Sequence, residues 1–208
     1  MNEGRRERAD AIRNRRAILA ATEKLLARHR PQDISMEQVA AAAGVGKGTV
    51  FHRFGNRSGL MRELMIERAR ALEEAVATGP PPLGAGAPDR ERLLAFLDAI
   101  VEVVSRNKSL MAELAHSAAA EPLVREARET KEAGRERDDH PVYRFWHGHI
   151  SVLIATQRPE ADAELTAHLM LGALHSEPVL AQLADQGPKR LTAAMRALAC
   201  AVLDAPGD

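Results

Sequence analysis

Residues 34–54, ISMEQVAAAAGVGKGTVFHRF, decide the fold of this chain. The stretch opens with the strongest helix start in the sequence. Ser35 and Gln38 have the spacing of a capping box, in which each side chain binds the other residue's backbone N–H. An isoleucine before the box and a valine after it occupy the two positions of a hydrophobic staple. This helix ends early, because Gly44 can adopt the positive φ of a helix C-terminus.

A second short helix is predicted from Gly46 to Phe54, with Val50 and Phe54 one turn apart on its inner face. Its first residues are polar, and a turn with two glycines separates it from the preceding helix. A longer amphipathic pattern over residues 9–28 comes before both and completes a helix-turn-helix. In this arrangement the second short helix enters the major groove of DNA with its N-terminal residues.

The composition predicts an all-α fold. Of 208 residues, 45 % are hydrophobic, 3 % aromatic and 28 % charged. Ala, Leu, Arg and Glu are abundant, and these residues favour helices. No apolar run reaches the roughly 18–20 residues of a membrane span, and the Arg-rich N-terminus does not have the pattern of a secretory signal. A single cysteine, Cys200, excludes a disulfide framework and a multi-cysteine zinc site. These features are typical of a cytoplasmic protein.

Beyond the helix-turn-helix, helical patterns follow to the end of the chain. Asn56 is a good N-cap for a helix that runs to about Thr78, and a Gly- and Pro-rich loop over residues 79–88 follows it. Further helices are predicted near 89–106, 109–119, 121–133, 141–157, 160–185 and 188–204. The chain is thus expected to contain about nine helices.

Charge is distributed unevenly along the chain. The net formal charge is zero, but residues 1–57 carry a balance of +6 and residues 58–208 a balance of −6. We therefore expect a basic helix-turn-helix domain over 1–57 and a separate helical body over 58–208. A basic segment suits a polyanion such as DNA, although a solvated charged surface has the same balance. Arg5, Arg6 and Arg8 form either a disordered arm that reaches the DNA or a plain soluble tail.

The stretch from about Arg16 to Leu64 resembles the tetracycline-repressor (TetR) family of bacterial transcription regulators. The matching segments are residues 18–21, 35–44, 45–54 and 56–58. The Lys-Gly-Thr core, with an aromatic residue two positions after the threonine, is the most specific of them. The resemblance covers about a quarter of the chain. It implies a DNA-binding domain over 1–57 and a variable ligand-binding and dimerisation domain over 58–208.

Carried over by position, the family's DNA contacts fall on Ser35, Met36, Lys47, Gly48, Thr49, Phe51, His52 and Arg57. Met36 would bind phosphate through its backbone, and Gly48 would allow a close approach to the groove. Two positions depart from the family pattern. Phe51 stands where a tyrosine is usual, so a hydroxyl contact is lost, and Gly46 stands where a serine often caps the helix.

The last predicted helix offers a surface for a second copy of the chain. Its apolar seam is Leu191, Met195, Leu198 and Val202, and its ridge of small residues is Ala193, Ala197 and Ala201. With the 160–185 segment from two protomers, this helix would build the four-helix interface of the family. The same seam also fits a bundle within one chain.

By resemblance, a small molecule enters a cavity among the middle helices and changes the separation of the two DNA-binding heads. The candidate lining residues are Phe96, Met111, Tyr143, Phe145, Trp146, His149 and Met170. These side chains form either a pocket wall or plain core. No charged cluster interrupts the apolar stripes, so a mainly hydrophobic effector is expected.

No metal, cofactor or catalytic site is predicted. His147 and His149 point in different directions on one helix. His168 and His175 share a face but lack a carboxylate partner, and no Ser/His/Asp arrangement has a recognisable local context. The sequence therefore indicates a homodimeric, ligand-responsive repressor that binds a palindromic operator. The alternative is a helical small-molecule carrier or enzyme whose helix-turn-helix is only structural. A mobility shift on the DNA that flanks its gene separates the two.

Overall fold

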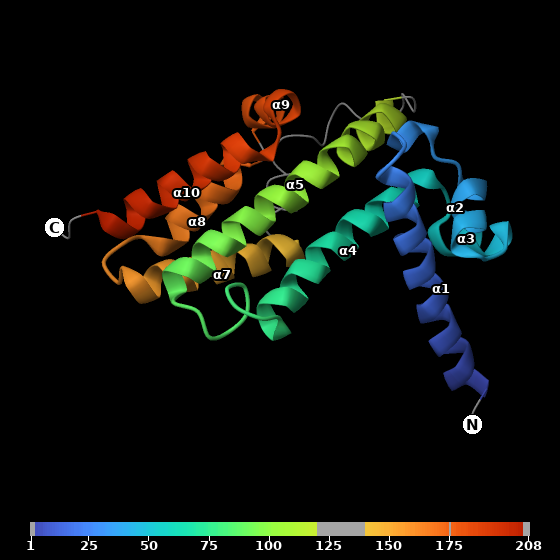
Figure 1. Cartoon of the computed structure of the whole chain (residues 1–208), viewed down its shortest axis with the longest axis horizontal. Helices are drawn as coiled ribbons and strands as arrows, with labels where there is room; N and C mark the ends of the chain where they lie inside the picture. Colours follow the sequence, from blue (N-terminus) through green and yellow to red (C-terminus); the bar gives the residue numbers. More distant parts are fainter. Residues whose placement is uncertain (1–2, 120–139, 175, 206–208) are drawn as a thin grey trace, which may run out of the picture. The chain divides into compact units, whose positions relative to one another are not determined.

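The computed structural model describes residues 3–119, 140–174 and 176–205, and these ranges contain helices and their connections without a strand (Figure 1). The elements in them are α1 (Glu3–Leu26), η1 (Pro31–Asp33), α2 (Met36–Ala43), α3 (Lys47–Phe54), α4 (Arg57–Thr78), α5 (Asp89–Ala119), α7 (Pro141–Gln157), α8 (Ala163–Ala173), α9 (Glu177–Gln186) and α10 (Pro188–Asp204). The predicted all-α fold class is confirmed. Over the same ranges, no helix has both the length and the apolar character needed to cross a membrane.

The helices form two compact units. The first comprises residues up to Ile66 and the part of α5 that begins at Ser109. The second comprises residues 67–108 and the chain from α7 onward. The division falls inside α4 and inside α5, so each of these helices contributes residues to both units. The change in charge balance, by contrast, lies at residues 57–58, where α4 begins.

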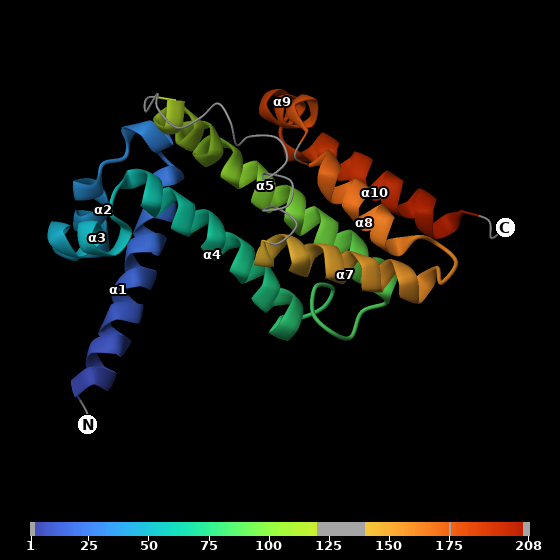
Figure 2. The ribbon, with the colours of Figure 1, turned by 180° about the vertical axis from the view of Figure 1, so that it is seen from behind.

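The core of the first unit lies where α1, α2, α3 and the start of α4 meet. α2 packs against α1, α3 packs against α2, and the N-terminal half of α1 extends beyond both short helices (Figures 1 and 2). The buried apolar side chains are Ile18, Leu19, Ile34, Met36, Val39, Ala40, Val50, Phe54, Leu60, Met61, Leu64 and Leu110. The long amphipathic pattern of α1 therefore packs through its second half.

Short-range hydrogen bonds build the turns of the helix-turn-helix. Ser35 N donates to Gln38 Oε1 at 2.7 Å, and Gln38 N donates to Ser35 Oγ at 3.1 Å, which confirms the predicted capping box. Gly44 ends α2 with a φ of 67°. Asn56 Oδ1 caps α4 by accepting from Gly59 N at 2.8 Å. These bonds set where α2 begins and ends and where α4 starts.

The second unit is a helical bundle with one continuous core. α5 supplies its central residues, and α7, α8 and α10 pack on them. The buried side chains are Ala69, Leu72, Leu93, Phe96, Leu97, Ile100, Val101, Trp146, Ile150, Leu153, Ile154, Ala163, Ala167, Met170, Leu171, Leu174, Met195, Ala199 and Leu203. The predicted helices over 141–157 and 188–204 are confirmed as α7 and α10.

The start of α1 differs from the prediction. α1 begins at Glu3, not near residue 9, so Arg5, Arg6 and Arg8 lie in a continuous helix rather than in an arm or tail. The segment is rich in Arg and Glu, which are good helix formers, and no proline stands in it. The helix of α1 therefore extends toward the N-terminus well beyond Ile18, the first of its residues in the core of the first unit.

The predicted break near residues 106–109 is wrong, because α5 is continuous from Asp89 to Ala119. Side-chain hydrogen bonds support the polar stretch at this point. Arg68 donates to the Arg106 carbonyl at 2.7 Å and to Asn107 Oδ1 at 2.8 Å. Leu110 follows with its side chain fully buried. Packing thus outweighs the local run of polar residues.

The single helix predicted over 160–185 is also wrong, since the structure has α8 and α9 in its place. Pro178 lies in the first turn of α9, where its missing N–H is tolerated. Ser176, the N-cap of α9, has an extended backbone with φ −72° and ψ 135°, and it separates α9 from α8. The helix predicted over 121–133 lies outside the described residues.

We predict that Gly44→Ala destabilises the first unit by about 1–2 kcal/mol, because an L-residue with a side chain is strained at positive φ. No neighbouring atom lies within 4 Å of a Cβ built at Gly44, so the strain comes from the backbone alone. Hydrogen exchange of the α2 and α3 amides measures the change. Gly48→Ala is the matched control, because Gly48 has helical geometry and equally open surroundings. If Gly44→Ala left the hydrogen-exchange protection of these amides unchanged, the positive φ of Gly44 would not be needed to end α2.

Candidate nucleic-acid interface

α3 is a short helix with one buried face and an exposed remainder. Val50 is 0 % exposed and Phe54 is 7 % exposed, and both belong to the core of the first unit. The residues that point outward are Lys47, Gly48, Thr49, Phe51, His52 and Arg53. They include all five residues of α3 that the sequence singles out for DNA contact, and Arg53 joins them.

The first turn of α3 is tied to α2 by charge. Lys47 forms an ion pair with Glu37, and its Nζ lies 5.4 Å from the centroid of the Phe51 ring. The hydrogen bond from Lys47 lowers the pKa of the Glu37 carboxyl. Both side chains are more than half exposed, so the pair is weak and the ammonium can exchange Glu37 for another anion.

The N-termini of α2, α3 and α4 all lie in the first unit, and each has backbone N–H groups suited to an anion. Ser35 is exposed at the start of α2, whereas the Met36 side chain is buried, so only the backbone of Met36 is suited to an anion. Arg57 stands at the start of α4, and its guanidinium donates to the Gln32 carbonyl at 2.7 Å. Arg57 therefore also holds the segment that leads into α2.

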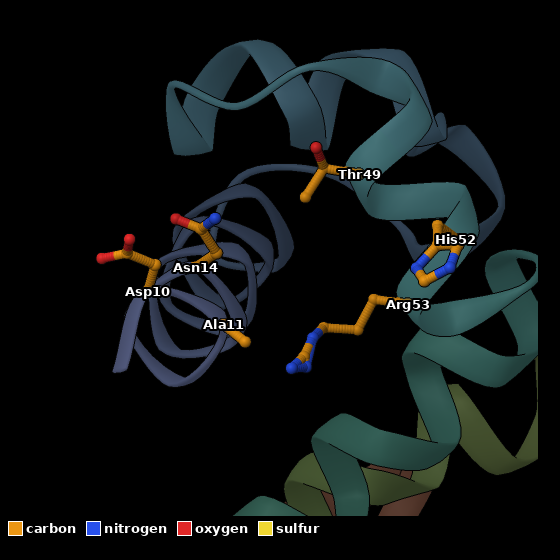
Figure 3. Close-up of a pocket in the computed structure, with 6 residues that line it drawn as sticks. All are labelled: Asp10, Ala11, Asn14, Thr49, His52 and Arg53. Atoms are coloured by element: carbon orange, nitrogen blue, oxygen red, sulfur yellow. The ribbon is translucent and has the colours of Figure 1, made fainter. Parts of the chain in front are cut away.

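A cleft of about 550 Å³ opens between α1 and α3. Its lining residues are Asp10, Ala11 and Asn14 from α1, and Thr49, His52 and Arg53 from α3. Figure 3 shows that the Arg53 guanidinium reaches across toward Ala11, while the His52 ring lies farther from α1. Asp10 is paired with Arg13, its neighbour on the same helix. The cleft thus has one carboxylate and several groups that can donate hydrogen bonds.

The sequence alone did not point to Asn14 and Arg53, which line this cleft, as candidate site residues. The helical spacing of Thr49 and Arg53, four residues apart, was a usable signal for Arg53, because such residues share a face. Asn14 had no such signal. It reaches the cleft only because α1 and α3 pack in the same unit.

The residues proposed for ligand binding are only partly brought together. Phe96, Trp146 and Met170 are buried in the core of the second unit, and Tyr143 and Phe145 pack against that core. The centroid of the His149 ring lies 4.6 Å from that of Phe96 and 6.0 Å from that of Phe145. Met111 does not join this cluster, since it is 45 % exposed and belongs to the first unit.

The cluster carries polar atoms among its apolar side chains. Burial lowers the pKa of the His149 imidazole, and the charge of Arg92 lowers it further. His149 Nε2 and Trp146 Nε1 are buried and have no hydrogen-bond partner among the described residues. An apolar molecule with a hydrogen-bond acceptor would match this combination.

The seam predicted on α10 divides between two environments. Met195 is 2 % exposed, and Leu191 and Val202 pack partly against the core of their own unit. Leu198 is 54 % exposed, and the ridge of Ala193, Ala197 and Ala201 also faces outward. On α8, Leu165 is 54 % and Leu169 is 66 % exposed. The second unit therefore presents apolar side chains outward on both helices.

Comparisons with known proteins agree with these features. Residues 18–64 match the family model described as bacterial regulatory proteins, tetR family. A Rhodococcus sp. protein described as a TetR-family transcriptional regulator has a similar structure, with a TM-score of 0.60, 20 % identity, and coverage of 92 % of this chain and 99 % of that one. A TetR transcriptional regulator from Streptomyces coelicolor is similar with a TM-score of 0.55 and 22 % identity, over 91 % of this chain and 96 % of that one.

A fatty acid degradation regulator from Bacillus halodurans also shares the fold, with a TM-score of 0.56, 16 % identity, and coverage of 92 % of this chain and 95 % of that one. No curated protein sequence matches the chain. The family match covers the C-terminal part of α1, all of α2 and α3 and the start of α4, and the shared fold extends over both units. Residues 18–64 are therefore similar to the helix-turn-helix region of bacterial regulatory proteins of the tetR family, and the fold of the described chain is that of solved regulators of this type.

Proposed function

We propose that the protein is a homodimeric transcriptional repressor that binds a palindromic operator and is released by a small, mainly apolar molecule. The observation that carries this proposal is the outward face of α3. Val50 and Phe54 anchor the helix, and its remaining side chains are free of the core. A helix held in this way can enter a major groove without unfolding.

The exposed residues of α3 have distinct roles in this proposal. Lys47 and Gly48 meet base edges, because they lie in the first turn of the helix. Thr49 and His52 bind phosphate. Ser35, the Met36 backbone and Arg57 bind phosphates at the neighbouring helix N-termini. Phe51 supports Lys47 through its ring.

We predict that Lys47→Ala weakens operator binding by about 1–3 kcal/mol, because it removes a base contact. A mobility shift at stated salt, on the DNA that flanks the protein's own gene, measures the loss. Gly48→Ala should fold as the native protein does, since a Cβ there meets no atom within 4 Å. It should nevertheless bind the operator more weakly, because the methyl group stands at the groove. If both variants bound the operator with native affinity, the outward face of α3 would not be the surface that contacts the bases.

The cleft between α1 and α3 fits one strand of the DNA backbone. Arg53 supplies a fixed positive charge, and Asn14 and Thr49 supply neutral donors. Asp10 opposes a phosphate at the same place. The cleft therefore contributes affinity without sequence preference.

We predict that Arg53→Ala weakens binding to all sequences alike and lowers the slope of log K against log salt by about one unit. Asp10→Asn should have the opposite effect and increase the affinity for DNA, since it removes a charge that repels phosphate. Titrations at several salt concentrations test both. Arg28→Ala is the control, because this exposed arginine lies beyond the C-terminal end of α1 and does not line the cleft. An Arg53→Ala slope equal to that of Arg28→Ala would exclude the cleft from the interface.

The outward apolar residues of α8 and α10 form the proposed contact with a second copy of the chain. Leu165 and Leu169 are one helical turn apart, and Leu198 lies beside a ridge of alanines on α10. A two-fold arrangement of these helices gives a four-helix interface. Two linked heads can then read two half-sites about one turn of DNA apart.

We predict that Leu169→Asp shifts the protein from dimer to monomer, because a charge is then buried in the interface. Light scattering measures the mass, and operator affinity should fall with it. Val152→Asp is a matched control, since Val152 is 63 % exposed on α7 of the same unit. A Leu169→Asp variant that remains dimeric would show that the copies meet elsewhere or do not need this face.

The proposed effector binds at the cluster around Phe96, Phe145 and Trp146. Apolar walls favour a hydrophobic body, the Trp146 N–H favours an acceptor on it, and His149 Nε2 can donate or accept according to its tautomer. α4 and α5 each continue from this unit into the other, which provides a covalent route for coupling. The ligand shifts the population toward a state with lower DNA affinity.

A further inference from the structure

Two histidines from different helices meet on the surface of the second unit. The ring centroids of His147 on α7 and His168 on α8 lie 4.0 Å apart. His168 Nδ1 lies 2.7 Å from the Tyr143 hydroxyl, and His147 Nε2 lies 3.1 Å from the Glu164 carbonyl oxygen. His168 is exposed and His147 is partly exposed, so solvent and ions reach the pair.

The hydrogen bonds determine which nitrogens remain available. A carbonyl oxygen only accepts, so His147 Nε2 carries the proton, and Nδ1 of the neutral ring holds a lone pair. A tyrosine hydroxyl both donates and accepts. When His168 donates from Nδ1 to the Tyr143 oxygen, its Nε2 holds a lone pair as well. Neither remaining nitrogen has a hydrogen-bond partner among the described residues.

This arrangement is the one that prepares imidazoles for a metal ion. A ligating histidine binds the metal through one nitrogen, and a carbonyl or another polar group holds its second nitrogen and fixes the tautomer. Two nitrogens bound at about 2.0–2.1 Å to one tetrahedral Zn²⁺ stand about 3.3 Å apart. The centroids of the two rings are 4.0 Å apart, so the two imidazoles lie close enough to share one ion.

We propose that His147 and His168 form a binding site for a divalent transition-metal ion such as Zn²⁺, in which Tyr143 and the Glu164 carbonyl position the two rings. Within the described residues, no group of three or more His, Cys, Asp or Glu side chains gathers around a possible ion. Water therefore completes the coordination, and the site is open to solvent. The ion would link α7 to α8. This inference does not depend on the proposed DNA-binding function.

Binding of Zn²⁺ to the untagged full-length chain, followed by calorimetry, tests the proposal. We expect one ion per chain at this site and at least a tenfold loss of affinity in His147→Ala and in His168→Ala. Tyr143→Phe should weaken binding about tenfold, because it removes the group that orients His168. His29→Ala is the control, since His29 is exposed in the first unit. His168→Gln keeps the side-chain size and guards against a folding defect.

Electron paramagnetic resonance with Cu²⁺ as a probe adds a readout of the ligands themselves. Cu²⁺ binds nitrogen sites more tightly than the other divalent ions of its row, so it occupies a two-imidazole site readily. The native protein should show coupling to two imidazole nitrogens, and His168→Ala should show one. Equal Zn²⁺ affinity in the native protein and both histidine variants would overturn the proposal. A Cu²⁺ signal that His168→Ala leaves unchanged would do the same.

Discussion

The burial of Val50 and Phe54 is the constraint on which the outward face of α3, the proposed DNA-binding face, depends. α3 has eight residues, and isolated helices shorter than about 12–15 residues are marginal in water. Its N-cap, Gly46, offers no side-chain hydrogen bond, so the helix lacks the usual local support at its start. Packing of two side chains into the core of the first unit holds the helix instead, and its other faces remain available for recognition.

Helices of the second unit likewise have one buried face and one exposed face. α8 and α10 each bury one stripe, through Met170 and Met195, and expose another, through Leu169 and Leu198. A helix that has apolar residues on two faces can join its own core and a second surface. The apolar pattern alone does not say which residue serves which face. Leu198 and Met195 are three residues apart in one seam, yet only the latter is buried.

Buried and exposed histidines illustrate how environment decides chemistry. His149 lies beside two phenylalanine rings, and burial lowers the pKa of its imidazole. His147 is two residues away, and its Nε2 donates to the backbone carbonyl of Glu164 in α8. Pairings along the chain placed His147 with His149 and His168 with His175, but His147 meets His168 in space. His175 lies outside the described residues.

The sequence by itself determined the features whose partners are neighbours in the chain. The capping box at Ser35, the end of α2 at Gly44 and the extents of α7 and α10 all rest on bonds or periodicity within a few residues. Tertiary structure decided what depends on distant partners: the continuity of α5 beside Arg68, the cleft between α1 and α3, and the meeting of His147 with His168. The physical reason is that local hydrogen bonds are specified by adjacent residues. Contacts between helices follow from the packing of whole faces, which no short stretch of sequence contains.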